Sequence, residues 1–308
     1  MDISIIIVGY KCCSDIENTV ASVKKHFTGF EYEMIVVNNY AGDEELPSLM
    51  AKFPELIVID NGTNPGFGIA NNSGLAVAKG EYICFMNPDI IILNNILPLM
   101  QMLESDDSIG LIGPLLRNSD LSVQLSRHYL PTPKNWFAFC FSLNSIFPKI
   151  TIWGNYSGND FSYKGDAESG WVSGAFMLTR RTLMNKIGGF DPSFFMYSED
   201  VDLCWMVQDA GYKVMFSDKS EAIHIGGVTS ASKSLSKARM MAQSRIILWK
   251  KHYQKRDVRR LILSTYQSSA LKAICWTMLC AMRISKKTNE RDYNWLMAKL
   301  MREELKAL

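Results

Sequence analysis

The sequence predicts an α/β fold with a mostly parallel central sheet flanked by helices, followed by a carboxy-terminal helical region. Short β-branched runs alternate with helical patterns in the first part of the chain, as is typical of right-handed βαβ units. Beyond about Ser230 the helical pattern continues to the end without Gly or Pro. With 308 residues, 47% of them hydrophobic and 21% charged, the chain can bury a sizeable core.

The predicted elements follow one another in order. Ser14 and Asp43 are the predicted caps of the first two helices. Gly188 is expected to end the helix over 180–187, and Ser198 to open the helix that begins at Glu199. The predicted strands are 3–8, 34–37, 56–59, 83–86, 171–178, 213–216 and 222–225, and the other predicted helices are 14–27, 44–53 and 68–79.

The periodicity fades between residues 114 and 170, where Pro and Gly are scattered among aromatic residues. A long aromatic connection of this kind is either a lid or substrate-binding insertion, or plain hydrophobic cover. We expect residues 1–230 to form one domain and residues 231–308 a second, helical region.

Cysteine usage and the amino terminus favour a cytoplasmic protein. The seven cysteines have no metal-ligand spacing and lie mostly in apolar runs, so we expect them to be reduced packing residues. The apolar run 3–8 is too short for a signal core or a membrane span. The net charge of +2 gives no reason to expect a nucleic acid partner.

Polar residues follow three of the predicted strands. Asp89 comes directly after Pro88, which ends the run 83–86, and so lies at the carboxyl edge where open α/β sheets bind ligands. A divalent cation that bridges two phosphates needs such an oxygen ligand. Tyr10 and Asn38 follow the first two strands. Tyr10 can stack on a nucleotide base, and the Asn38 side-chain carbonyl can accept a hydrogen bond from an N–H group of that base. The alternative is that both residues only form ordinary turns.

Three further features allow two interpretations each. The Gly-rich turn 64–74 feeds a helix and suits either a phosphate or a tight turn. Glu199 and Asp200 follow aromatic residues, which raise carboxyl pKa values as a general base requires, yet acids at a helix start also act as caps. His224 is either a structural histidine or a metal ligand.

In their order along the chain these segments resemble the family 2 inverting glycosyltransferases of the GT-A fold, particularly the bacterial rhamnosyltransferase-like branch. The resemblance covers about residues 3 to 230. It implies a metal-dependent hexosyltransferase that moves a sugar from dTDP-rhamnose or a UDP-sugar to a hydroxyl of a bacterial cell-surface glycan, such as O-antigen or capsule, by one inverting displacement. The segments that carry it are 4–8, 36–39, 64–74, 87–89, 171–175, 188–191, 195–205, 210–212 and His224.

The resemblance also implies the roles of individual residues. Asp89 would hold Mg²⁺ or Mn²⁺, and His224 would be a further metal ligand or a pyrophosphate contact. Asp200 would be the general base, with Glu199 as the second candidate. Relatives usually carry Asp where Asn38 stands, which puts the base contact in doubt. The implied donor residues are Val8, Tyr10, Asn38, Asn64, Gly66, Phe67, Asn71, Asn87 and Asp89, and the implied sugar and acceptor residues are Trp171, Gly174, Ala175 and Arg127. Arg127 is either a residue that reaches a phosphate or a solvated surface arginine.

The tail has two interpretations. Basic residues between Lys250 and Arg260 precede an apolar segment, 261–282, which Lys272 and polar residues make unsuitable for spanning a bilayer. This arrangement suits peripheral docking on an anionic membrane surface, here the cytoplasmic face of the inner membrane, where a lipid-linked glycan acceptor would lie. The alternative is a helical pair that packs on the catalytic domain or forms a homodimer.

Two other functions compete with the glycosyltransferase. A sugar nucleotidyltransferase would carry a basic Gly-rich phosphate loop near the amino terminus, which residues 9–14 lack. A non-catalytic carbohydrate-binding or scaffold protein would not need Asp89, Glu199, Asp200 and His224 together.

Overall fold

The chain forms two compact units in a computed structural model that describes residues 1–147, 156, 161–226, 235–282, 284 and 287–308. The sheet unit comprises Met1–His128, Asp160–Phe195 and Glu199–Gly227, and the helical unit comprises Tyr129–Asn159, Met196–Ser198 and Val228–Leu308. The boundary predicted at residue 230 lies outside the described residues. Residues 129–159, which the sequence assigned to the first domain, group with the carboxy-terminal helices instead.

The sheet unit is built on one nine-stranded sheet within the described residues. Its amino-terminal half is parallel, as predicted: β1 pairs with β2 and β4, and β2 with β3. Beyond β4 the sheet is mixed, because β10 runs antiparallel between β4 and β6. The order is β3 (Ile57–Asp60), β2 (Tyr32–Asn38), β1 (Ile3–Gly9), β4 (Tyr82–Met86), β10 (Phe176–Arg180), β6 (Ile109–Arg117), β11 (Lys213–His224) and β5 (Ile90–Ile92), with β8 (Ala167–Glu168) on β11; β7 (Arg127–His128) and β9 (Trp171–Val172) form a separate pair.

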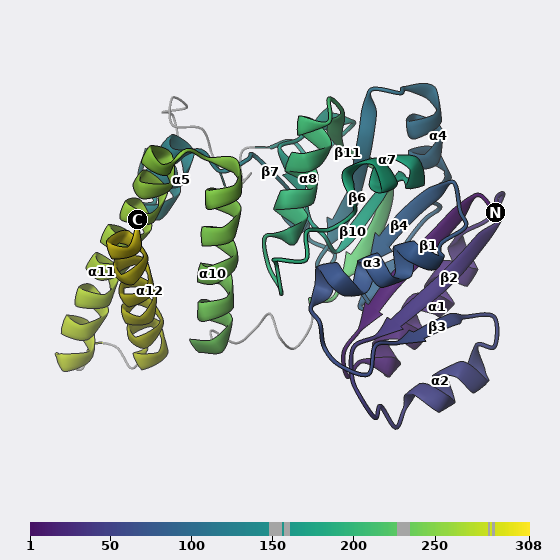
Figure 1. Cartoon of the computed structure of the whole chain (residues 1–308), viewed down its shortest axis with the longest axis horizontal. Coiled ribbons are helices and arrows are strands. Elements are labelled where there is room, and N and C mark those ends of the chain that lie inside the picture. Colours follow the sequence, from purple (N-terminus) through teal and green to yellow (C-terminus); the bar gives the residue numbers. More distant parts are fainter. Residues whose placement is uncertain (148–155, 157–160, 227–234, 283, 285–286) are drawn as a thin grey trace. The chain divides into compact units, whose positions relative to one another are not determined.

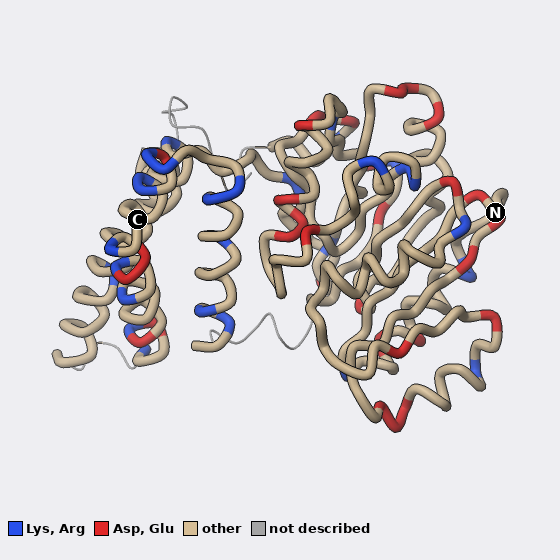
Figure 2. The backbone as a smooth tube through the Cα atoms, viewed as in Figure 1, with Lys and Arg blue, Asp and Glu red and all other residues tan. Residues whose placement is uncertain are grey.

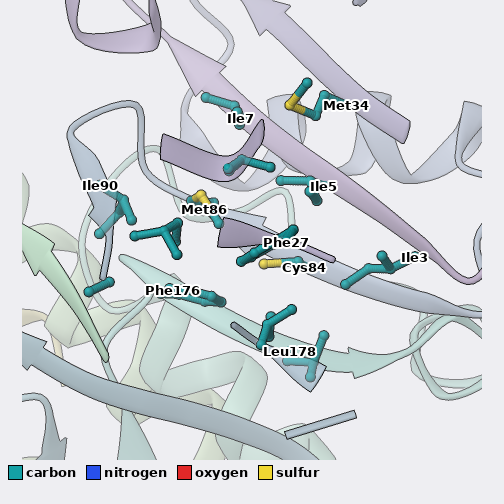
Figure 3. Packing of buried hydrophobic residues seen from close by; sticks show 14 of the residues in the cluster. Ile3, Ile5, Ile7, Phe27, Met34, Cys84, Met86, Ile90, Phe176 and Leu178 are labelled. Carbon is teal, nitrogen blue, oxygen red and sulfur yellow. The ribbon is translucent and has the colours of Figure 1, made fainter. Parts of the chain in front are cut away.

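Helices cover both faces of this sheet (Figure 1). Alternate residues of β1 point to opposite faces: Ile3, Ile5 and Ile7 pack with one set of helices, and Ile6 and Val8 with the other. Figure 3 shows the first of these clusters. Its helices are α1 (Cys13–His26), α2 (Leu46–Lys52) and α4 (Leu97–Ser105), while the opposite face carries α3 (Phe67–Val77), α7 (Arg181–Ile187) and α8 (Glu199–Asp209).

Several predicted boundaries change. The predicted caps are wrong, because α1 begins at Cys13 and α2 at Leu46, neither with a side-chain cap. Asp43 instead accepts a hydrogen bond from the Glu45 amide (3.1 Å), a turn that precedes the helix. The strands predicted over 213–216 and 222–225 are one strand, β11, with an irregularity between Ser217 and Glu221. Gly188 ends α7 in a left-handed conformation, as predicted.

The helical unit contains part of the aromatic connection. Trp136 is buried, donates its indole N–H to the Thr265 hydroxyl (2.8 Å) and packs its ring on Trp249 (centroids 5.2 Å apart). This part of the connection therefore serves as hydrophobic core. The helices of the unit are α5 (Pro133–Cys140), α6 (Leu143–Ile146), α10 (Leu235–His252), α11 (Lys255–Ala281) and α12 (Thr288–Ala307).

Two further expectations concern cysteines and membrane spans. All seven cysteines are free thiols. Within the described part of the chain, no helix combines the length and apolarity needed to cross a bilayer.

Candidate active site

Strand register brings the predicted donor residues to one edge of the sheet. Gly9 is level with Asn38, and Ile7 with Met86, so β1, β2 and β4 end together. Tyr10, Asn38 and the segment from Asn87 to Asp89 therefore leave the sheet side by side.

Asp89 and His224 form a carboxylate–imidazole pair at this edge. The last residues of β11 run antiparallel to β5 with His224 level with Ile90, which places the imidazole beside the residue before that strand. Asp89 Oδ1 lies 3.4 Å from His224 Nε2, and Asn87 Nδ2 lies 3.3 Å from the same nitrogen. Asp89 is buried, and its backbone carbonyl accepts a hydrogen bond from the Ile225 amide (3.1 Å).

Gln124, which the sequence did not single out, orients the imidazole. Its Nε2 donates to Asn118 Oδ1 (3.0 Å) and to the His224 carbonyl (3.3 Å), so its Oε1 must be the atom that faces His224 Nδ1 at 2.8 Å. Because Oε1 can only accept, Nδ1 carries the hydrogen in the neutral ring. The lone pair is then on Nε2, the nitrogen that lies close to both Asn87 Nδ2 and Asp89 Oδ1.

These residues fit a divalent cation. A carboxylate oxygen and an unprotonated imidazole nitrogen on adjacent sites provide two ligands, and cations bound to diphosphates usually take only one or two ligands from the protein. Another group, Cys13 with Asp43 and Glu45, also brings three possible ligand atoms together. Burial raises the pKa of the Cys13 thiol to about 12, so this thiol stays protonated and is a poor ligand.

The predicted acids lie in the first turn of α8. Asp200 Oδ2 accepts a hydrogen bond from the Gly174 amide (3.0 Å), and Oδ1 accepts one from the Val201 amide (2.9 Å). Glu199 is also buried, and its Oε2 has no hydrogen-bond partner among the described residues.

This difference decides which acid holds a proton. Burial, followed by the charge of Asp200, raises the pKa of Glu199 to about 8. Burial also raises the pKa of Asp200, but the backbone N–H groups of Gly174 and Val201 oppose the rise by stabilising its charged form. Of the two acids, Asp200 is therefore the one that ionises first, and Glu199 the one that keeps its proton.

Gly174 and Ala175 connect the acid pair with the Asp89–His224 pair. The Gly174 amide binds Asp200, while the Ala175 carbonyl accepts a hydrogen bond from the Asn87 amide (2.8 Å). A Cβ atom at Gly174 would lie 2.9 Å from the Asp200 Cβ. The structure therefore requires Gly174 to make room for the proposed base, whereas its predicted contact with the sugar remains a prediction.

The backbone that leads into α8 is strained. Tyr197 (φ 72°) and Ser198 (φ 66°) are consecutive non-glycine residues in the left-handed region, a costly conformation that clusters at functional sites. Within the helical unit, the Ser244 hydroxyl of α10 donates to the Met196 carbonyl (2.7 Å). Met196, Tyr197 and Ser198 therefore directly precede Glu199 in the chain with a fixed carbonyl and a strained backbone.

The Gly-rich turn 64–74 is held against Phe195, the residue before this segment. The Phe67 amide donates to the Phe195 carbonyl (3.0 Å), and a Cβ atom at Gly66 (φ 102°) would lie 2.4 Å from the same oxygen. Gly66 is thus needed for close backbone approach as well as for its conformation. Asn64 Oδ1 accepts a hydrogen bond from the Gly66 amide (3.1 Å), and Asn71 Nδ2 donates to the Phe67 carbonyl (3.0 Å).

Asn38 has neighbours that sequence reasoning missed. Its Nδ2 donates to the Tyr40 carbonyl (2.8 Å) and lies 3.3 Å from Asp60 Oδ1, so a carboxylate lies beside the amide that replaces the usual Asp. Tyr10 is half exposed and meets the Tyr40 ring edge-on at 5.6 Å. Lys11 Nζ lies 4.4 Å from the centre of the Tyr40 ring. Val8 is buried behind this cluster in β1.

Arg127 and Trp171 come from the β7–β9 pair. Arg127 is buried, which rules out a solvated surface arginine; it donates to the carbonyls of Ser162 (3.1 Å) and Glu168 (2.8 Å). The Trp171 ring stacks on His128 with centroids 4.1 Å apart. A phosphate contact of Arg127 stays a prediction, and the two hydrogen bonds given above are made to backbone carbonyls.

The fold and this edge define a GT-A type nucleotide-sugar transferase: a central α/β sheet with helices on both faces, whose carboxyl edge carries polar residues. The family model of glycosyl transferase family 2 matches residues 4–204, and the model of glycosyl transferase family group 2 matches residues 127–297. The chain belongs to glycosyl transferase family 2 and is a glycosyltransferase.

Curated relatives include rhamnosyltransferases. The chain is 26% identical over 203 residues to the N-acetylglucosaminyl-diphospho-decaprenol L-rhamnosyltransferase of Mycobacterium tuberculosis, a match that covers 62% of this chain and 66% of that protein. It is 28% identical to the rhamnosyltransferase WbbL of Escherichia coli, covering 63% and 73%. Among solved structures, the mannosyltransferase PcManGT of Pyrobaculum calidifontis with GDP-Man and Mn²⁺ superposes with a TM-score of 0.58 at 14% identity, covering 99% of this chain and 86% of that one.

The protonated state of Glu199 predicts how stability depends on pH. Native Glu199 keeps its proton up to about pH 8, whereas the unfolded carboxyl loses it near its ordinary value, so the free energy of unfolding falls as pH rises through this interval. Glu199→Gln removes this loss. Relative to wild type, E199Q should gain a few kcal/mol between pH 5 and pH 9 in urea unfolding, since each pKa unit corresponds to about 1.4 kcal/mol. Exposed Glu44→Gln is the control, and parallel curves for E199Q and wild type would contradict the assignment.

The hydrogen bond from His224 to Gln124 predicts an effect on metal affinity. Gln124→Leu leaves Nδ1 without its acceptor and frees the ring to change tautomer, so Mn²⁺ affinity in the presence of dTDP should fall by about 10–100-fold. Electron paramagnetic resonance of free Mn²⁺ measures this directly. Gln208→Leu is the matched control, because Gln208 Nε2 donates to two backbone carbonyls, those of Gly170 (2.7 Å) and Cys204 (3.0 Å). Equal affinities of both variants would exclude the orienting role of Gln124.

Proposed function

We propose that the enzyme transfers a sugar, most specifically rhamnose from dTDP-rhamnose, to a hydroxyl with inversion at the anomeric carbon. The observation that carries this proposal is the unequal environment of the two buried acids. An ionised Asp200 held by two backbone N–H groups can accept a proton, and a neutral Glu199 beside it cannot compete for that role.

Asp200 acts as the general base in this proposal. As the acceptor hydroxyl attacks the anomeric carbon from the face opposite the diphosphate, its proton passes to Asp200. Burial makes Asp200 a stronger base than a solvated aspartate, because the pKa of its carboxyl is raised. The bonds from Gly174 and Val201 fix the direction of the carboxylate, so that one displacement completes the transfer.

Asp89 and His224 would hold Mn²⁺ or Mg²⁺, with the remaining sites taken by diphosphate oxygens. The bound cation would neutralise charge on the leaving nucleoside diphosphate. Mg²⁺ prefers oxygen ligands, so the imidazole of His224 favours Mn²⁺. The presence of Mn²⁺ with GDP-Man in the similar mannosyltransferase structure supports a divalent cation here.

The nucleotide and acceptor are assigned from chemistry and similarity. The exposed ring of Tyr10 and the partly buried ring of Tyr40 offer a stacking surface for the base, and Asp60 with Asn38 offers acceptors for its N–H groups. The mycobacterial relative is named for a sugar acceptor on a decaprenyl diphosphate, which supports a lipid-linked acceptor in cell-surface glycan synthesis. Such an acceptor would bring the enzyme to a membrane surface.

Isosteric substitutions of the acid pair test the mechanism. Asp200→Asn keeps the volume but removes the base, so transfer should fall by about 10²–10⁴-fold while dTDP affinity stays unchanged. Glu199→Gln keeps a neutral group and should retain transfer within a few-fold. Both are measured with dTDP-rhamnose and a panel of UDP-sugars, with Mn²⁺, Mg²⁺ and chelator. Wild-type turnover by D200N would remove Asp200 from the mechanism, and activity in chelator would exclude the metal.

A further inference from the structure

Positive charge is concentrated in the carboxy-terminal part of the chain. Residues 228–308 contain 18 Lys and Arg against five Asp and Glu, whereas residues 1–227 contain 15 against 26. Figure 2 shows Lys and Arg along α10, α11 and α12. The net charge of the whole protein is near zero because its two parts carry charges of opposite sign. An anionic surface would attract residues 228–308 and repel residues 1–227.

An apolar stripe lies on the exposed side of α11. Leu271, Ile274, Met278 and Met282 recur at helical spacing, and each is about half exposed, between 46% and 57%. The opposite side of the helix is buried, including Leu261, Ile262 and Ala273. The stripe thus remains uncovered after α11 has packed within the helical unit.

Cations flank this stripe at both ends in the sequence. Lys255, Arg256, Arg259 and Arg260 precede it and are exposed, and Asp257 is the single acid between Lys255 and Ala281. Lys287 follows it in the sequence. Anionic headgroups with an apolar layer beneath them complement this order of charged and apolar residues, and long basic side chains can reach the headgroups while the stripe inserts.

We propose that the apolar stripe of α11 and its flanking cations dock on the surface of an anionic phospholipid membrane. The inference deepens the proposed function, since a lipid-linked acceptor is presented at such a surface. A second copy of the chain is the less suitable occupant. A two-fold contact would bring the same cationic patch of both copies together, and these like charges repel.

Vesicle flotation of the full chain tests this surface. Wild type should float with phosphatidylcholine vesicles containing 30% phosphatidylglycerol, weakly with phosphatidylcholine alone, and less at 0.5 M NaCl. Ile274→Gln with Met278→Gln should lower the partition coefficient at least tenfold. Arg256→Gln with Arg259→Gln should lower it roughly fivefold per charge. The matched control is Met50→Gln with Val77→Gln, which removes similarly exposed apolar side chains from the sheet unit and should leave flotation unchanged.

The possible outcomes separate this surface from the catalytic proposal. Unchanged flotation of I274Q/M278Q, or equal binding to both vesicle types, overturns the docking surface. The docking surface is also overturned if wild type does not float and light scattering gives it a dimer mass that I274Q/M278Q abolishes. Transfer to a short-chain, water-soluble acceptor is measured in parallel and should be the same in I274Q/M278Q and wild type. Flotation without transfer would contradict the proposed function and leave the surface intact.

Discussion

The proposed active site depends on backbone groups of two consecutive residues, Gly174 and Ala175, between β9 and β10. The Gly174 amide donates to Asp200, and the Ala175 carbonyl accepts from the Asn87 amide. The acid pair and the segment from Asn87 to Asp89 lie more than 100 residues apart in the sequence, and this short turn fixes one relative to the other. It can do so because β10 lies beside β4, with Phe176 level with Met86. A side chain at Gly174 would occupy the space of the Asp200 Cβ.

Burial and strain then determine what the acids can do. Ionising both of two adjacent buried carboxyl groups costs much free energy. The backbone N–H groups of Gly174 and Val201 stabilise the charged form of Asp200, so Asp200 is the acid that ionises first. Tyr197 and Ser198 hold the preceding backbone in an unfavourable conformation, which the Ser244 contact with Met196 helps to maintain. In the sequence, residues 197–200 resemble an ordinary helix start. In the structure, two residues with left-handed backbone precede two buried acids that differ in their hydrogen bonds.

Periodicity and strand ends were sufficient to predict the parallel half of the sheet, the edge that gathers Tyr10, Asn38 and Asp89, and the helical tail. They failed at β6, where Gly110, Gly113 and Pro114 resemble a turn. The two glycines lie in a strand because other side chains approach there: added Cβ atoms would lie 2.6 Å from Tyr212 and 2.8 Å from Val172. Such contacts arise only in the folded chain and leave no periodic signal.

Isolated polar residues were missed for the same reason. Gln124 and Asp60 lie outside the ordered motifs, and only the fold shows that one orients His224 and the other adjoins Asn38. Arg127 illustrates the reverse case, since its charge suggested either phosphate or solvent, whereas it is buried against backbone carbonyls. The guanidinium carbon of Arg127 lies 4.0 Å from the centre of the Phe161 ring and 5.4 Å from that of the Phe216 ring. The spacing of residues in the sequence does not predict these contacts.

The turnover of Gly174→Ala, compared with Ala175→Gly, tests most directly whether this turn positions the proposed base. The added methyl group must displace Asp200, whereas A175G removes a methyl group and keeps the carbonyl that binds Asn87. The account predicts that G174A loses at least about a hundredfold in kcat, in line with loss of a positioned base, with dTDP affinity and thermal stability near those of A175G. Turnover of G174A equal to that of A175G would contradict it.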